Sequence, residues 1–136
     1  ATESVTVVIY SRAFASSEHA YQAAKCAVEA DYARFQEPAL TAGGAKRLGR
    51  TIPLRADWEQ VKLQVMRAVV YDKFTRNVGL RERLIVTGSA GLVEGNTWGD
   101  VWYGRVLRAG AWVGENHLGR ILMEVRALLV ADTLPF

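Results

Sequence analysis

Apolar residues recur at helical spacing in the middle of the chain and predict a long helix there. It is expected to run from Asp57 to about Asn77, with Asp57 and Gln60 as a capping box at its start. Its apolar positions form one stripe and an adjoining one, namely Trp58, Val61, Val65 and Val69, then Met66, Val70 and Phe74. Two such stripes are broad enough to be buried against more than one neighbour.

A second apolar stripe predicts another long helix towards the end of the chain, with Asn116 as its cap. The residues of this stripe are Leu118, Ile121, Leu122, Val125, Leu128 and Leu129. They are expected to be core, and Glu124 and Arg126 are expected to interrupt them as exposed charges.

Shorter patterns predict the remaining elements. Val5 to Tyr10 is rich in β-branched residues and is expected to be a strand, leading to a helix that Ser16 or Ser17 caps and that ends near Ala30. Further expected features are a continuation or second helix over 31–36, a break at Pro38 and Gly43-Gly44, a short helix that Gly49 stops, a helix from about Leu80 to Val86, and a strand over Leu92 to Glu94. The patterns together predict an α+β fold, a single compact and mainly helical domain with a few short strands over residues 1–136.

The composition of the 136-residue chain is that of an ordinary globular protein, with 50% hydrophobic and 23% charged residues. No apolar run approaches the roughly 20 residues that a membrane-spanning helix needs, and the first residues lack the basic and apolar regions of a signal peptide. A cytoplasmic protein is therefore expected. The net charge of +3 fits an anionic ligand such as a phosphate without requiring a nucleic acid.

The expected helix after Ser16 carries the most informative polar residues. Four side chains share one face of it at helical spacing: Glu18, Tyr21, Gln22 and Lys25. On a half-buried face the pKa of a lysine tends to fall and that of a carboxylate to rise, which suits both groups to chemistry near neutral pH. The alternative is that Glu18 and Lys25 are simply solvated.

Cys26 is the single cysteine, so an internal disulfide is excluded. With His19 and His117 as the only other strong ligands for a soft metal, no zinc site is expected, and no cofactor is predicted. Cys26 could be a nucleophile beside Lys25, but a small thiol on an alanine-rich helix is expected to serve packing.

Three cations lie within the six residues from Ala45 to Arg50, and they are Lys46, Arg47 and Arg50. They could grip a phosphate, for which arginine offers a planar fork of donors. Cations solvated at a helix end, opposite the negative end of its dipole, are the alternative. Trp58 lies at the expected first turn of the next helix, where its ring could stack on a base or sugar or pack in the core.

A dense aromatic segment covers 96–104, with Trp98, Trp102 and Tyr103 around the acid Asp100. Neither helical nor alternating spacing accounts for it. A loop that carries aromatics and glycines commonly lines a pocket. A hairpin with a glycine-kinked corner is the alternative.

The order and spacing of several motifs are informative as a set. The motifs are Ser17-Glu18-His19-Ala20-Tyr21-Gln22-Ala23-Ala24-Lys25, Ala45-Lys46-Arg47-Leu48-Gly49-Arg50, Trp58 with Val61-Lys62 and Val65-Met66, Lys73-Phe74, Leu84, Thr87-Gly88, Leu92-Val93-Glu94, Asp100 with Trp102, and Gly114 to Arg126. In this order they resemble one family, the NADAR or YbiA-like N-glycosidases, over about residues 16–129.

The resemblance implies a YbiA-like α+β fold and hydrolysis of a ribose–nitrogen bond, either in a phosphorylated ribosylamine intermediate of riboflavin synthesis or in ADP-ribosylated guanine. By motif position it implies Glu18, Lys25 and Asp100 as catalytic residues, with Lys25 in covalent chemistry at the sugar. The expected substrate-binding residues are Tyr21, Gln22, Lys46, Arg47, Arg50, Trp58, Trp102 and Asn116. A carboxylate can stabilise an oxocarbenium-like sugar or, when protonated, donate to the leaving nitrogen, and Glu18 and Asp100 could exchange these roles.

Two features depart from the pattern of the family. Its members usually carry an additional segment with a Phe-Ser-Asn-Phe-like motif ahead of the first strand, which the printed sequence lacks. A truncated sequence, another segment or subunit in that place, or an incomplete pocket is therefore expected. Trp102 is followed by Tyr103-Gly104 where the family usually has Trp-Gly, which predicts a different loop shape.

An N-glycosidase acting on a nucleotide-like small molecule is the first functional hypothesis, with nucleic acid only as a modified substrate and with no membrane partner. A non-catalytic module that binds ADP-ribose or a related nucleotide is the second, although the presence of Glu18, Lys25 and Asp100 together argues against it. A structural protein that uses the aromatic segment as a contact surface is the third.

Overall fold

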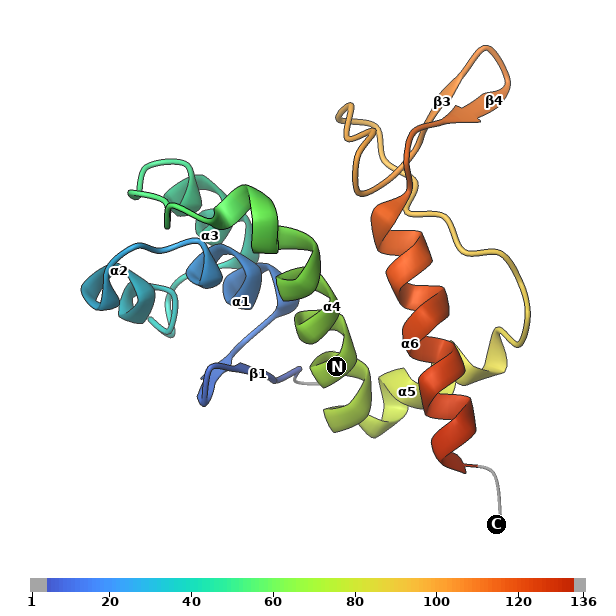
Figure 1. The fold of residues 1–136 in the computed structure, drawn as a ribbon, viewed down its shortest axis with the longest axis horizontal. Helices are drawn as coiled ribbons and strands as arrows, with labels where there is room; N and C mark the ends of the chain where they lie inside the picture. The colour runs from blue at the N-terminus through green and yellow to red at the C-terminus, as the bar shows by residue number, and fades with distance from the viewer. Residues whose placement is uncertain (1–4, 134–136) are drawn as a thin grey trace. The chain divides into compact units, whose positions relative to one another are not determined.

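The computed structural model describes residues 5–133, which form six helices and two antiparallel sheets of two strands each (Figure 1). Contacts divide the chain into two compact units, Ala1–Val78 and Gly79–Phe136, and each unit has its own helices and its own small sheet. The predicted α+β class is confirmed. The predicted single domain over 1–136 includes residues 1–4 and 134–136, which lie outside the described residues, and it stays a prediction.

The first unit starts with a β-hairpin where the sequence predicts one strand. Strands β1 (Val7–Ile9) and β2 (Arg12–Phe14) pair antiparallel. Tyr10 and Ser11 connect them with φ angles of 51° and 63°, the left-handed region that a tight hairpin turn requires. Because neither residue is glycine or asparagine, the sequence gives no sign of this turn or of the second strand.

Helix α1 (Ser17–Ala24) begins where the sequence predicts it. Ser16 precedes it with extended backbone, and its Oγ accepts a hydrogen bond from the backbone N–H of His19 at 3.2 Å. The buried imidazole of His19 lies 2.6 Å from Ser16 Oγ through Nδ1 and 2.7 Å from the carbonyl oxygen of Leu40 through Nε2. Both ring nitrogens of His19 therefore hold the start of α1 in place.

Helix α1 ends before the predicted end near Ala30, which is a correction. Cys26 forms an isolated antiparallel bridge with Leu54, so the chain after α1 pairs with a distant segment instead of continuing the helix. A separate helix, α2 (Glu29–Arg34), then covers the region for which a continuation or a second helix is expected. Tertiary pairing thus sets this boundary, and local helix propensity does not.

Helix α3 (Ala42–Gly49) begins before Ala45, and the break expected at Gly43 and Gly44 is wrong because both glycines lie inside its first turn. Thr41 Oγ1 accepts a hydrogen bond from the N–H of Gly44 at 3.0 Å. This side-chain cap offsets the low helix propensity of the two glycines. The helix ends at Gly49, as predicted.

Helix α4 (Trp58–Arg76) confirms the predicted long helix, and Val65 and Val69 on its apolar stripe are buried. The predicted capping box is wrong. The carboxylate of Asp57 accepts hydrogen bonds from the guanidinium of Arg55 at 2.6 and 3.0 Å and makes no capping hydrogen bond. A charged bidentate partner competes better for this carboxylate than the free N–H groups of the helix.

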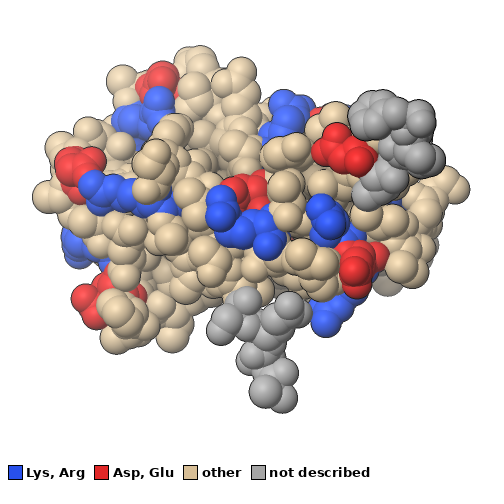
Figure 2. Space-filling model, turned by 90° about the horizontal axis from the view of Figure 1, so that it is seen from below, with Lys and Arg blue, Asp and Glu red and all other residues tan. Residues whose placement is uncertain are grey.

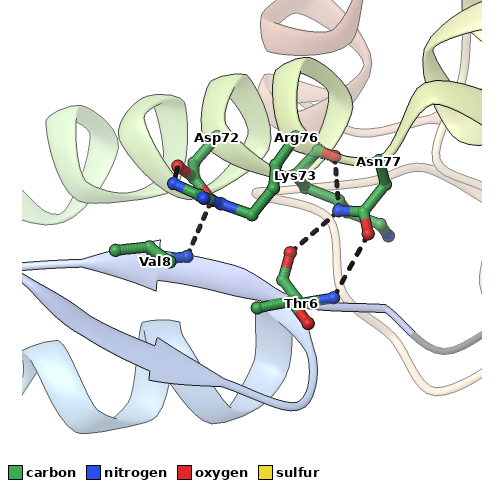
Figure 3. Close-up of polar contacts among 6 residues, drawn as sticks. All are labelled: Thr6, Val8, Asp72, Lys73, Arg76 and Asn77. Carbon is green, nitrogen blue, oxygen red and sulfur yellow. Dashed lines mark hydrogen bonds and ion pairs between the residues drawn. The ribbon is translucent and has the colours of Figure 1, made fainter.

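Side chains at the C-terminal end of α4 and at its C-cap form hydrogen bonds with the hairpin and the residue before it (Figure 3). Asp72 accepts a hydrogen bond from the backbone N–H of Val8 at 2.7 Å, and Arg76 donates two hydrogen bonds to the same carboxylate. The side chain of Asn77 accepts from the N–H of Thr6 at 3.3 Å and donates to the carbonyl of Thr6 at 2.8 Å. A sheet of two short strands is marginal alone, so these bonds give β1 its place in the first unit.

The second unit contains helices α5 (Val78–Val86) and α6 (His117–Thr133) and strands β3 (Val106–Arg108) and β4 (Ala111–Val113). Both helices confirm predicted ones, and the apolar stripe of α6 buries Ile121, Val125 and Leu129. The strand expected over Leu92 to Glu94 is wrong, since this segment is irregular. Its backbone hydrogen-bonds the side chain of Asn116, and the carbonyl of Glu94 accepts from the N–H of Arg105 at 2.8 Å, which leads only to an isolated bridge at Gly95.

The burial of Arg126 on α6 is a further correction to the sequence prediction. The sequence predicts an exposed charge here, yet only 7% of Arg126 is exposed, whereas Glu124 is exposed as predicted. Its guanidinium donates a hydrogen bond to Thr87 Oγ1 at 2.8 Å, and that hydroxyl donates to the carbonyl of Leu84 at 2.6 Å. The residue after α5 thus gives a buried cation on α6 a polar partner.

No helix in residues 5–133 is long and apolar enough to cross a membrane. Figure 2 shows that cationic and acidic side chains are interspersed on the face drawn there.

Candidate active site

One face of α1 in the first unit carries a carboxylate, an amide and an amine. Glu18 lies in the first turn, Gln22 one turn further on, and Lys25 at the C-cap. Gln22 Nε2 donates a hydrogen bond to Glu18 Oε1 at 3.4 Å. Tyr21 and Gln22 are only 7% and 4% exposed, so this face is partly buried, as the chemical interpretation of the sequence requires.

Two aromatic rings flank the amine of Lys25. Nζ lies 5.5 Å from the ring centroid of Tyr21 and 5.9 Å from that of Trp58. The two rings meet edge to face with their centroids 5.2 Å apart, and Trp58 is buried. Trp58 therefore packs in the core and at the same time forms a wall beside the amine.

Backbone pairing brings Trp58 to this place. The N–H of Arg55 donates to the carbonyl of Lys25 at 2.8 Å, and the N–H of Ala27 donates to the carbonyl of Pro53 at 3.2 Å. Trp58 follows this paired segment as the first residue of α4. The early end of α1 is thus the feature that joins the lysine to its aromatic neighbour.

Burial lowers the pKa of Lys25 from its ordinary value of 10.5. The carboxylate of Glu18 acts in the opposite direction, while the cations Arg50 and Lys46 lower the pKa further. Lys25 therefore loses its proton more readily than a solvated lysine. The unprotonated amine is the form that attacks carbon.

The three cations at the C-terminal end of α3 do not all point towards Lys25. Lys46 and Arg50 lie one helical turn apart, and both act on Lys25 as like charges. Arg47 is directed along its own helix instead, with one guanidinium nitrogen 3.5 Å from the point that a Cβ on Gly43 would occupy. Of the three predicted cations, Lys46 and Arg50 thus contribute to the surroundings of Lys25.

Cys26 next to Lys25 is half-buried, and burial raises the pKa of its thiol to about 11. A thiol with such a pKa is protonated near neutral pH and is a poor nucleophile. The packing role expected from the sequence is therefore favoured. Among residues 5–133, no group of three or more His, Cys, Asp or Glu side chains could hold a metal ion.

Asp100 organises the aromatic loop of the second unit. Its Oδ1 accepts hydrogen bonds from the backbone N–H groups of Trp102 and Tyr103 at 3.1 and 3.0 Å. The amide of Asn96 holds the backbone of Asp100 from the other side, accepting from its N–H at 2.9 Å and donating to its carbonyl at 2.7 Å. One carboxylate oxygen of Asp100 thus serves the shape of the loop.

Trp102 lies between two other rings in this unit. Its ring centroid is 4.6 Å from that of Tyr103 and 4.5 Å from that of His117 at the start of α6. A hollow of about 600 Å³ lies nearby, lined by the loop around Asn96 and by the β3–β4 hairpin, including Trp112. The loop lines this hollow through Gly95, Asn96, Thr97 and Gly99, whereas the aromatics Trp98, Trp102 and Tyr103 and the acid Asp100, which the sequence suggests for a pocket, are not among its lining residues.

Asn116 is almost fully buried and uses both ends of its amide within the second unit. Its Oδ1 accepts from the backbone N–H of Glu94 at 2.9 Å, and its Nδ2 donates to the carbonyl of Leu92 at 2.8 Å. A Cβ on Gly119 would lie only 2.3 Å from that amide, so only glycine fits there. The structure therefore directs the side chain of Asn116 at the backbone.

The predicted site residues fall into two sets. Those that the first unit brings together are Glu18, Tyr21, Gln22, Lys25, Lys46, Arg50 and Trp58. Asp100, Trp102 and Asn116 belong to the second unit. Gly49 was missed by sequence reasoning, although it touches Gln22, because a contact between two helices leaves no periodic signal.

The family model of the NADAR domain matches residues 1–130, and the chain therefore belongs to the NADAR domain family. An N-glycosidase of Nostoc punctiforme is 40% identical to it over 117 residues, which are 83% of this chain and 72% of that protein. N-glycosidase YbiA of Escherichia coli is 37% identical over 126 residues, covering 86% of this chain and 71% of that protein.

Two further comparisons extend the match. A riboflavin biosynthesis protein of Vibrio vulnificus is 37% identical over 130 residues, which are 89% of this chain and 32% of that longer protein. The NMR structure of Escherichia coli YbiA matches with a TM-score of 0.81 at 34% identity, covering 96% of this chain and 76% of that one. The predicted family and fold are confirmed, and the names of the relatives bear out the predicted N-glycosidase class.

Proposed function

We propose that this chain is an N-glycosidase that hydrolyses the bond between ribose C1 and nitrogen in a phosphorylated, nucleotide-like substrate. Lys25 carries this proposal, because it is a half-buried amine of lowered pKa beside Glu18, Tyr21 and Trp58. The relatives named N-glycosidase support the same class of reaction.

In the proposed mechanism the unprotonated Nζ of Lys25 attacks C1 of the ribose. The C1–N bond breaks with its electron pair, and the leaving nitrogen takes a proton from a nearby acid. Nζ, now bonded to C1, gives up a proton to the carboxylate that protonated the leaving nitrogen. Its lone pair then opens the sugar ring, O4′ takes that proton, and a protonated Schiff base joins C1 to the lysine. Water adds to C1, the amine departs, and the sugar is released with an oxygen at C1.

Glu18 is the proposed proton donor and acceptor beside the amine. Its carboxylate influences the charge of Lys25, and it lies on the same helix face. It can donate to the leaving nitrogen and afterwards take a proton from the attacking water, as one carboxyl group does in two-step glycoside hydrolysis. Asp100, Trp102 and Asn116 stay site residues by resemblance to the family.

Lys46 and Arg50 are the proposed ligands of the substrate phosphate, and Tyr21 and Trp58 the proposed walls for its planar part. Two cations one turn apart at the end of α3 can form charge-assisted hydrogen bonds with phosphate oxygens. The same phosphate would counter the positive charge that the two side chains place near Lys25.

Two classes of compound are candidates for the substrate. A phosphorylated ribosylamine intermediate of riboflavin synthesis is favoured, because a relative of Vibrio vulnificus is named as a riboflavin biosynthesis protein. ADP-ribosylated guanine is the second candidate, taken from the family resemblance, and a cytoplasmic location belongs to the proposal in either case.

Incubation of the protein with each candidate substrate, followed by mass spectrometry of the products, tests the proposed function. Release of the free nitrogen base or amine together with a sugar phosphate is the expected result. Binding of either compound without turnover would instead favour the non-catalytic nucleotide-binding module. If the protein neither binds nor turns over either compound, both hypotheses are contradicted.

A further inference from the structure

The amide of Gln22 is held between a catalytic candidate and a neighbouring helix. Its Nε2 donates to Glu18 Oε1 at 3.4 Å, and its Oε1 is buried without a hydrogen-bond partner. A buried acceptor that lacks a partner is costly, and such a group needs a reason to persist. Gln22 Oε1 stays without a partner because the amide group is held in one orientation.

Gly49 on α3 fixes that direction. A Cβ on Gly49 would lie 2.0 Å from Gln22 Oε1 and 2.8 Å from its Cδ, so the amide rests directly against the glycine backbone. Rotating the amide by half a turn would place its oxygen against the Glu18 carboxylate, where two acceptors would meet without a proton. Packing therefore presents the N–H₂ group to Glu18.

We propose that Gln22 is a positioning residue that orients the Glu18 carboxylate for proton transfer, and that Gly49 holds Gln22 in the required orientation. This inference rests on the proposed function. It replaces a substrate contact by Gln22 with an indirect role, because only 4% of the residue is exposed and its donor already faces Glu18. The contact also joins Glu18 to the part of α3 that carries Lys46 and Arg50.

Two substitutions distinguish the effect of the Gln22 N–H₂ donor from that of its packing against Gly49. Gln22→Met keeps a side chain of similar length against Gly49 but removes the donor, and it is expected to lower kcat about tenfold with KM changed less than about twofold. Gly49→Ala is expected to lower kcat similarly, because the new methyl group displaces the amide. Gln64→Ala, an exposed glutamine on α4, is the matched control with unchanged kinetics.

A double-variant cycle tests the coupling. Gly49→Ala should change kcat little in a Gln22→Ala background, because the group that it displaces is then gone. Additive losses would overturn the proposed role of Gly49. Unchanged kcat in Gln22→Met, or a raised KM with unchanged kcat, would overturn the positioning role and restore a direct substrate contact.

A measurement that needs no turnover keeps this inference separate from the proposed function. Burial lowers the pKa of Lys25, the charge of Glu18 raises it, Arg50 and Lys46 from α3 lower it, and Cys26 raises it. If Gln22→Met lets Glu18 swing away, the midpoint pH for amine labelling of Lys25, followed by mass spectrometry, should fall. An unchanged midpoint would overturn the inference, whereas an inactive wild type with a shifted midpoint would overturn the proposed function alone.

Discussion

Lys25 acquires its chemistry from its neighbours. Partial burial lowers its pKa, Tyr21 and Trp58 flank the amine, and Glu18 lies on the same face of α1. Glu18 and Tyr21 share α1 with Lys25, and the packing of α1 against α4 brings Trp58 beside them. At the scale of single residues, a capped helix start and a buried tryptophan are thus enough to place an amine, an acid and aromatic walls together.

The separation of the three cations on α3 leads to a kinetic prediction. Lys46→Ala and Arg50→Ala should each raise the KM for a phosphorylated substrate about tenfold, or about 1.4 kcal/mol, since each removes a charge-assisted hydrogen bond. Arg47→Ala on the same helix is the matched control, because Arg47 is directed at Gly43, and its KM should change less than about twofold. Steady-state kinetics measure all three variants. Equal effects would contradict the claim that Lys46 and Arg50, but not Arg47, bind the phosphate.

The lowered pKa of Lys25 also predicts how stability depends on pH. Between the folded pKa of Lys25 and the ordinary 10.5 of the unfolded chain, the unfolded state binds more protons, so the free energy of unfolding rises with pH through this window. Lys25→Met removes the group and should be more stable than the wild type at pH 7, with the difference shrinking towards pH 10.5. Urea unfolding at several pH values measures this, and a gap that widens with pH would contradict the pKa shift.

At the scale of elements, α4 contributes to both the site and the hairpin of the first unit. Its first residue, Trp58, supplies a wall beside Lys25, and its last turns hold β1 through Asp72 and Asn77. The hairpin in turn packs on α1, whose face carries the site. Changes far from Lys25 on α4 should therefore appear as changes in stability before they appear in catalysis.

Asp72→Ala tests this at the hairpin end of α4. It removes the acceptor for the N–H of Val8 and the partner of Arg76, and is expected to lower the free energy of unfolding by about 1–3 kcal/mol. Glu59→Ala on the same helix removes an exposed ion pair with Lys62 and should cost less than about 0.5 kcal/mol. Urea unfolding compares the two, and equal small losses would show that β1 does not depend on Asp72.

The second unit offers a matched pair at the hydrogen bond between Thr87, which follows α5, and Arg126 on α6. Thr87→Val leaves the buried guanidinium of Arg126 without its hydroxyl acceptor and is expected to cost about 1–3 kcal/mol. Arg126→Met removes the buried charge as well and should cost less, because an apolar residue needs no partner there. Thermal unfolding ranks the two variants, and a larger loss for Arg126→Met would contradict this account.

At the scale of the whole molecule, the sequence predicts what depends on periodicity. The stripes of α4 and α6 and the cap of α1 are all local patterns, and the structure confirms both helices and the cap. Leu128 is the exception in the α6 stripe, because it is 52% exposed although the stripe predicts it to be core. Features set by distant contacts escape prediction, namely the early end of α1 at Cys26 and the buried Arg126. The hairpin turn at Tyr10 escapes it for a local reason, because no usual turn residue marks it.

The site follows the same division. Glu18, Tyr21 and Lys25 could be chosen from one helix face, and Trp58 from its motif. The contact of Gln22 with Gly49 could not be predicted, because a missing Cβ has meaning only once the facing helix is known. Nor could the sequence separate Lys46 and Arg50 from Arg47, which requires the direction of each side chain.

The central claim is that Lys25 forms a covalent bond to the sugar, and trapping the Schiff base tests it most directly. The wild type is incubated with substrate and borohydride and then mapped by peptide mass spectrometry, which distinguishes the lysines of the chain, namely Lys25, Lys46, Lys62 and Lys73. We expect a reduced sugar adduct on Lys25, and neither adduct nor product from Lys25→Ala. Turnover by Lys25→Ala at the wild-type rate, or an adduct on another lysine with none on Lys25, would contradict the account.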